Sequence, residues 1–151
     1  MTTITNTFHL SINAPPEAVF AYVSDLTRHG EWNSGLKIVP LAASPVGVGS
    51  QYRTKGEVPG QKERPNELRV THYQSPTRFA FVAKDPDFNE VSHDFTFKPL
   101  SGGTLMERAV TVELPPLVAL AFRTIIHPLI GKPAMAKSFA VLKAKLEQKA
   151  V

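Results

Sequence analysis

The 151-residue sequence contains no cysteine, which excludes disulfide bonds, thiolate catalysis and zinc sites built on cysteine. Long apolar runs are also missing. The most apolar stretch, LPPLVALAFRTIIHPLIG, is interrupted by Arg123, His127 and three prolines, whereas a membrane-spanning helix needs roughly 20 apolar residues. The amino-terminal MTTITNTFHL lacks the basic and apolar regions of a secretory signal. We therefore expect a cytoplasmic protein without a membrane-inserted segment.

Familiar catalytic motifs are absent as well. The sequence has no Gly-x-Ser-x-Gly elbow, no His-Glu-x-x-His pair, no Walker A loop and no Gly-x-Gly-x-x-Gly at the start of a helix. Its five histidines show no metal-ligand spacing. From these absences we predict no metal site, no cofactor and no identifiable catalytic residue.

The chain is basic, with a net charge of +4 and an isoelectric point of about 9.5, which raises the question of a nucleic-acid partner. Its lysines and arginines are scattered, and the two densest groups also contain Glu63, Glu67 and Glu147. No recognition-helix, zinc-finger or RNP-like motif accompanies them. This pattern is typical of solvated faces, and we expect no nucleic-acid binding.

What is present is a regular succession of elements. Residues 3–12 alternate weakly as a first strand, and NAPPEAVFAYVSDL has the proline and acid of a helix start followed by an apolar face. From residue 36 to residue 114, alternating segments separated by short Pro/Gly turns predict six further strands. The order predicts one α+β domain over residues 1–151, with a seven-stranded antiparallel sheet.

The carboxyl-terminal part is predicted to be helical. Met135, Phe139, Leu142 and Leu146 recur at spacings of four, three and four, which makes one apolar stripe. Pro128 and Pro133 predict that this helix is bent or segmented. Because the stripe is the only large apolar surface available to cover the sheet, we expect the helix to lie on it. A strongly twisted sheet around one helix would leave a cavity between them.

Arg108 is the unusual residue of the last strand, TLMERAVTVEL. Strand alternation places Met106, Arg108, Val110 and Val112 on the apolar face, although a guanidinium needs a partner when it is buried. In one interpretation Arg108 anchors the polar head of a ligand whose apolar tail lies against aromatic side chains. In the other, it reaches solvent or pairs with a local acid.

Other candidates share the predicted inward face. Phe81, and the set Val91, His93, Phe95 and Phe97, line up with period two on their strands, and Tyr52 takes the same face. His72 faces inward with Leu68 and Val70 if no bulge interrupts that strand. Trp32, in the break after the first helix, is either a packing anchor or a residue near the mouth of a pocket.

Several segments occur together in an informative order: INAPPEAVFAYVSDLTRHGEWNSG, GVGSQYR, VTHYQSPTRFAF and DFTFKPLSGGTLMER. In this order and spacing the chain resembles the polyketide cyclase/dehydrase and lipid-transport group of the START-like (SRPBCC, helix-grip) superfamily. The resemblance covers essentially the whole chain. It implies a seven-stranded curved sheet, two short helices after the first strand, and a long carboxyl-terminal helix gripped over a hydrophobic pocket.

The resemblance also implies a function. We expect binding or transport of a small hydrophobic molecule of lipid, polyketide or aromatic type, by a monomer or weak homodimer. The predicted ligand-binding residues are Trp32, Tyr52, His72, Phe81, His93, Phe95, Arg108, Met135 and Phe139. Two alternatives stay open. One is a cyclase or dehydratase in which His93 or His72 acts as acid or base and Arg108 stabilises an enolate. The other is a quinone- or partner-protein-binding module.

Overall fold

The computed structural model describes residues 1–33, 36–43, 45–55, 66–84 and 90–149. Seven strands form one sheet in the order β1-β7-β6-β5-β4-β3-β2, and all neighbouring strands are antiparallel. The strands are β1 (Thr2–Ile12), β2 (Lys37–Pro40), β3 (Gln51–Lys55), β4 (Glu67–Gln74), β5 (Arg78–Lys84), β6 (Val91–Leu100) and β7 (Gly103–Leu114). The predicted seven-stranded antiparallel sheet is confirmed.

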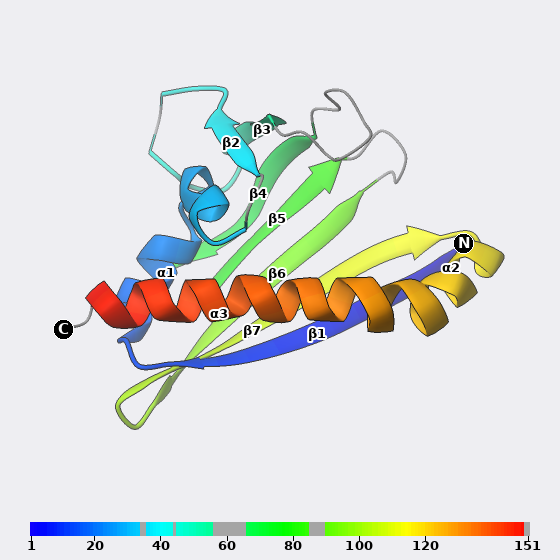
Figure 1. Ribbon diagram of the computed structural model, residues 1–151. Helices are drawn as coiled ribbons and strands as arrows, with labels where there is room; N and C mark the ends of the chain where they lie inside the picture. The colour runs from blue at the N-terminus through cyan, green and yellow to red at the C-terminus, as the bar shows by residue number, and fades with distance from the viewer. Residues whose placement is uncertain (34–35, 44, 56–65, 85–89, 150–151) are drawn as a thin grey trace.

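Helices follow β1 and β7. They are α1 (Pro16–Val23), the 3-10 helix η1 (Leu26–Glu31), α2 (Pro116–Ala121), the π-helix η2 (Phe122–Gly131) and α3 (Lys132–Lys149). Prolines begin α1 and α2, where the missing N–H has no partner to lose. Asp25 caps η1 by accepting from the Thr27 backbone N–H over 3.1 Å. Figure 1 shows α3 lying across the concave side of the sheet, the predicted helix-grip arrangement.

The carboxyl-terminal helix is segmented, as its prolines predict. Pro128 lies inside η2, where a residue without an N–H removes one backbone hydrogen bond and displaces the carbonyl of the preceding turn. The wider π turns accommodate this, and the chain continues into α3. Of the predicted apolar stripe, Phe139, Leu142 and Leu146 are buried and Met135 is half-buried.

Two hydrophobic clusters hold the helices on the sheet. The large core joins α1, η1, the middle of the sheet and α3, and its bulkiest members are Phe20, Trp32, Phe79, Phe95, Met106 and Leu142. The small core lies where α2 meets the ends of β1 and β7. It consists of Ile4, Val112, Leu114 and Ala119, with Val91 and Phe122 packed against it. The sheet is therefore covered at two separate places.

A bulge changes one strand from its predicted alternation. In β4 the pairing register shifts between Val70 and His72, so that Thr71 is the extra residue. Tyr73 consequently faces inward, with its ring 5.2 Å from that of Phe20, while His72 pairs with Ala80 and lies on the outer face. His72 was expected to face inward only if β4 had no bulge; the bulge is present, so His72 faces outward.

Candidate functional site

Arg108 is held at the centre of the concave face. Its neighbours across the sheet are Phe8 on β1 and Phe95 on β6, and only 6% of its surface is exposed. Alternation along β7 produces this orientation, since Met106 and Val112 of the same face are also buried. The inward orientation expected from the sequence is confirmed, and Arg108 does not reach solvent.

The guanidinium of Arg108 contacts neutral groups. Nη2 donates to Nδ1 of His93 over 2.9 Å, and Nη1 lies 3.4 Å from the sulfur of Met135. The guanidinium carbon lies 5.0 Å from the ring centre of Phe95 and 5.9 Å from that of Trp32, within the range of cation–π attraction. Among the described residues, no carboxylate forms an ion pair with Arg108. The ion-pair interpretation therefore finds no support in the described part of the chain.

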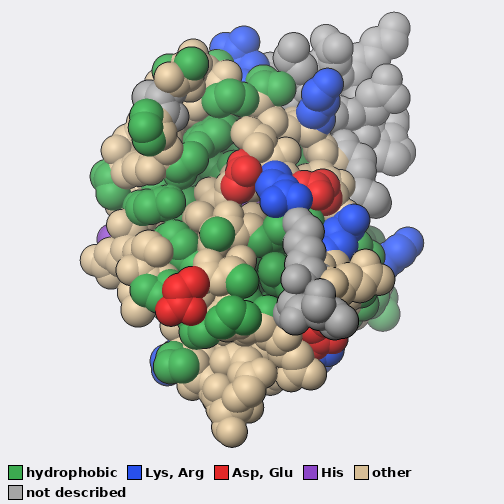
Figure 2. Space-filling model, turned by 90° about the vertical axis from the view of Figure 1, so that its left-hand side faces the viewer, with side chains coloured by type: hydrophobic (Ala, Val, Ile, Leu, Met, Phe, Trp, Pro, Cys, Tyr) green, Lys and Arg blue, Asp and Glu red, His purple; other side chains and the backbone are tan. Residues whose placement is uncertain are grey.

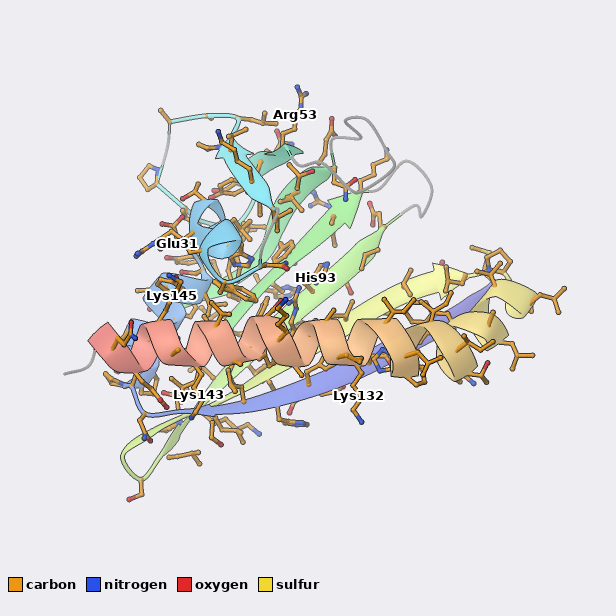
Figure 3. All side chains as sticks on the ribbon, viewed as in Figure 1. Glu31, Arg53, His93, Lys132, Lys143 and Lys145 are labelled. Atoms are coloured by element: carbon orange, nitrogen blue, oxygen red, sulfur yellow. The ribbon has the colours of Figure 1, made fainter. Side chains whose placement is uncertain are left out.

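His93 is defined by its bond to Arg108. A guanidinium has no acceptor, so Nδ1 of His93 must accept and the ring proton must lie on Nε2. Burial lowers the pKa of His93 well below 6.5, and the nearby charge of Arg108 lowers it further. The ring also stacks on Phe81, with 4.7 Å between ring centres. Figure 3 shows His93 between the sheet and α3.

His29 is a second histidine near Arg108, and we call Arg108, His93, His29, Trp32 and Phe95 the Arg108 cluster. Nothing in the sequence marks His29 as a candidate site residue. η1 places it in the core, where 2% of its surface is exposed and Nε2 donates to the Val23 carbonyl over 2.7 Å. Its ring centre lies 4.8 Å from that of Trp32 and 6.3 Å from that of Phe95. Burial, together with the charge of Arg108, lowers the pKa of His29 to about 4.

The cluster thus carries one buried positive charge. Burial lowers the pKa of Arg108 to about 10, so the guanidinium is still charged at neutral pH, whereas both imidazoles are neutral. Two donors in the cluster are buried without a hydrogen-bond partner among the described residues, Nε of Arg108 and Nε1 of Trp32. A buried N–H without an acceptor is costly, and an oxygen atom with negative charge beside Nε of Arg108 would accept from that donor and balance the charge.

A partly exposed row of side chains lies beside Arg108. Val110 pairs with Asn6 on one side and with His93 on the other, and all three are half-buried although they face inward. We call Asn6, Val110 and His93 the half-open row. It separates the large core from the small core. The concave face is therefore only partly covered next to the guanidinium.

The π-helix η2 lies at this part of the concave face. Its His127 packs on Phe8, with ring centres 5.6 Å apart, and on Phe122, at 6.1 Å. No η2 side chain is fully buried, and His127 and Phe122 are half-buried, whereas α2 before it contributes Ala119 to the small core and α3 after it contributes Phe139 to the large one. The segment thus connects two anchored helices across the half-open row.

The predicted site residues separate into groups. Trp32, Phe81, Phe95 and Phe139 are buried in the large core near Arg108 and His93, and Met135 is half-buried beside them. Tyr52 also belongs to the large core, but it lies on β3, four strand positions from β7. His72 lies on the opposite face of the sheet, so it is not part of this cluster.

Three hollows found on the surface lie elsewhere. One lies between α1 and α3, lined by Ala14, Ala18, Tyr22 and Leu146 among others, at the end of the molecule shown in Figure 2. The other two include outer-face residues of the sheet, such as Val82 and Lys84. None of these three is lined by Arg108 or His93.

Solved structures share this fold at low sequence identity. Protein CV1439 from Chromobacterium violaceum is 19% identical, with a TM-score of 0.64, over 95% of this chain and 97% of that chain. Ara h 8.0201 is 14% identical, with a TM-score of 0.69, over 96% of this chain and 98% of that one. Protein Ms6760 from Mycobacterium smegmatis is 17% identical, with a TM-score of 0.65, over 96% and 92%.

The comparison with family models covers nearly the whole chain, whereas no curated protein sequence matches it. Residues 1–147 match the model described as polyketide cyclase / dehydrase and lipid transport. This agrees with the resemblance carried by the α1–η1 segment and the β6–β7 hairpin, and with the strand order and the gripped helix. The chain belongs to the polyketide cyclase/dehydrase and lipid transport family.

Proposed function

We propose that this protein binds a small, largely apolar molecule that carries an acidic or oxygen-bearing head group, between the sheet and the carboxyl-terminal helix. The family includes lipid transport in its description, which supports an apolar ligand. The observation that carries the proposal is Arg108, a buried cation with an unpaired Nε and no carboxylate partner among the described residues.

The head group would lie against Arg108. A carboxylate, enolate or phenolate oxygen accepts from Nε of Arg108 and offsets the cost of burying the charge. Nε1 of Trp32 is a second donor in the same cluster. The hydrogen bond to His93 fixes the plane of the guanidinium, so little freedom is lost on binding.

The apolar part of the ligand would occupy the half-open row. Val110 and the rings of Phe8 and His127 offer apolar contact there, and Met135 adds an adaptable side chain. Covering this surface contributes about 25 cal/mol for each Å² of apolar area removed from water. Affinity would come mainly from that burial, and orientation from Arg108.

The alternative of a cyclase or dehydratase depends on a general base. His93 has its only free lone pair, on Nδ1, engaged by Arg108, and burial lowers its pKa. Taking up a proton would break that bond and place a second cation beside the first. His72 lies on the outer face. We therefore base the proposal on binding rather than on proton transfer.

The test compares an acid with its neutral analogue. Fluorescence titration with cis-parinaric acid and with its methyl ester is carried out on the wild type, on Arg108→Met and on Arg53→Met, in which an exposed arginine of β3 is removed. We expect Arg108→Met to weaken binding of the acid at least about tenfold and to leave the ester unchanged, because a charge-assisted hydrogen bond contributes roughly 1.5–3 kcal/mol. Equal binding of the acid by Arg108→Met and wild type would contradict the proposal, as would failure of both probes to bind.

A further inference from the structure

The α2–η2 segment exposes an unusual amount of aliphatic surface. Seven of its large aliphatic side chains have between 39% and 83% of their surface exposed. They are Leu117, Val118, Leu120, Ile125, Ile126, Leu129 and Ile130, which we call the aliphatic patch. Exposed apolar residues are ordinary when they are single, but a contiguous group marks an interaction surface.

The patch is exposed because its segment is anchored by other side chains. Ala119 is buried in the small core, Phe122 packs against that core, and His127 packs on Phe8. These contacts turn the opposite side of the segment, with its leucines and isoleucines, toward solvent. Figure 1 shows α2 at one end of the molecule, beside the amino terminus and far from α1.

The charges that the carboxyl-terminal helices place near the patch have one sign. Between Glu113 and Glu147 the chain contains no acidic residue, but it contains Arg123, Lys132, Lys137, Lys143 and Lys145. Arg123 and Lys132 lie next to the patch, and neither forms an ion pair with another described residue. In Figure 3 Lys132 extends from the helix past β1, away from the rest of the sheet.

These observations favour a lipid bilayer over two other partners, a second copy of this chain and a different protein. In a symmetric dimer through this face, the same cations of both copies would face each other without acids to pair them. An interface with another protein usually has an aromatic or arginine anchor at its centre, and the exposed patch is entirely aliphatic. A helix with aliphatic residues on its exposed side and cations at its margin fits the surface of an anionic lipid bilayer.

We propose that the α2–η2 segment docks this protein on anionic membranes, with the aliphatic patch in the interfacial layer and Arg123 and Lys132 at the lipid head groups. No helix in the described part of the chain is long and apolar enough to cross a bilayer. The segment therefore lies in the membrane surface. Because η2 also crosses the half-open row, docking would bring the membrane next to that row, although the docking itself does not depend on what the row binds.

The test measures binding to vesicles by co-sedimentation. Phosphatidylcholine vesicles are compared with vesicles that also contain phosphatidylglycerol. We expect wild-type protein to bind the anionic vesicles at least about tenfold more tightly, and to lose this preference at high salt. Equal binding to both kinds of vesicle, or to neither, would overturn the proposal.

Matched variants separate docking from general attraction. Leu129→Asp should weaken binding to the anionic vesicles at least about tenfold. Val48→Asp adds the same charge outside the patch and should have no effect. Both variants should fold, because the Leu129 side chain is 71% and the Val48 side chain 70% exposed. Arg123→Gln and Lys132→Gln should each weaken binding about fivefold, and Arg53→Gln, at a distant exposed site, much less. If Leu129→Asp binds as wild type does, the proposal is wrong. A second result would also overturn the proposal. In it, wild-type protein does not bind the vesicles, and sedimentation velocity shows that wild type is a dimer and Leu129→Asp a monomer.

Discussion

Arg108 donates a 2.9 Å hydrogen bond to Nδ1 of His93 from the neighbouring strand, and this pair joins a buried cation to a neutral imidazole. Buried arginines normally face carboxylates, and none of the described residues supplies one here. The pair is therefore stabilised only in part by the protein itself. We assign the unpaired Nε–H and the unbalanced charge of the guanidinium to a ligand.

The first prediction concerns stability. We expect Arg108→Met to leave the free energy of unfolding unchanged to within about 1 kcal/mol, or to raise it, because an apolar side chain of similar length removes the cost of burying a charge. Urea unfolding of both proteins measures this. A loss of more than about 2 kcal/mol would contradict the prediction, since it would mean that the guanidinium mainly serves the fold.

The second prediction concerns pH. Burial holds the pKa of His29 at about 4 in the folded protein and that of His93 well below 6.5, whereas both are ordinary in the unfolded chain. Between pH 6.5 and 4 the unfolded state takes up more protons, so the free energy of unfolding falls as the pH falls. The loss from His29 alone is on the order of 3 kcal/mol.

Denaturant unfolding at several pH values checks this. His29→Gln keeps a donor for the Val23 carbonyl but does not titrate, so its profile should be flatter over the same range. His72→Gln, on the outer face, is the control and should follow the wild type. An unchanged slope in His29→Gln would show that another group dominates the pH dependence.

The third prediction concerns the β6–β7 hairpin. A Cβ on Gly103 would collide with the carbonyl oxygen of Ile12, so the close approach of β1 to β7 requires glycine. We expect Gly103→Ala to cost about 1–3 kcal/mol in thermal or urea unfolding. Gly47→Ala is the matched control, because no atom lies within 4 Å of the added Cβ there. Equal stability of the two variants would show that β1 can move away freely.

The sequence predicted seven antiparallel strands, the inward orientation of Arg108 and the stripe Phe139, Leu142 and Leu146, because each follows from local periodicity. The pairing of β1 with β7 is a long-range contact that periodicity does not indicate. His72 was placed wrongly because a single extra residue, Thr71, inverts the faces of the rest of β4, and the sequence does not mark such a bulge. His29 was missed because its partners are a backbone carbonyl and rings from other elements.

The exposure of η2 could not be predicted either. From the sequence, Leu129 and Ile130 are as suited to the core as Leu142 and Leu146 are. The difference arises in three dimensions, where α2 and α3 are anchored on separate cores and η2 crosses between them. Hydrophobic periodicity measures which residues share a helix face, and here the π turns and Pro128 alter that periodicity.

The most direct test of the account observes the Nε–H of Arg108 by NMR, with the signal assigned by its loss in Arg108→Met. On addition of cis-parinaric acid, we predict that this proton shifts downfield and exchanges more slowly with solvent, because it gains a charged acceptor. The methyl ester should produce a much smaller change. If the acid binds and the Nε–H signal of Arg108 does not move, the guanidinium does not meet the head group and the central claim is wrong.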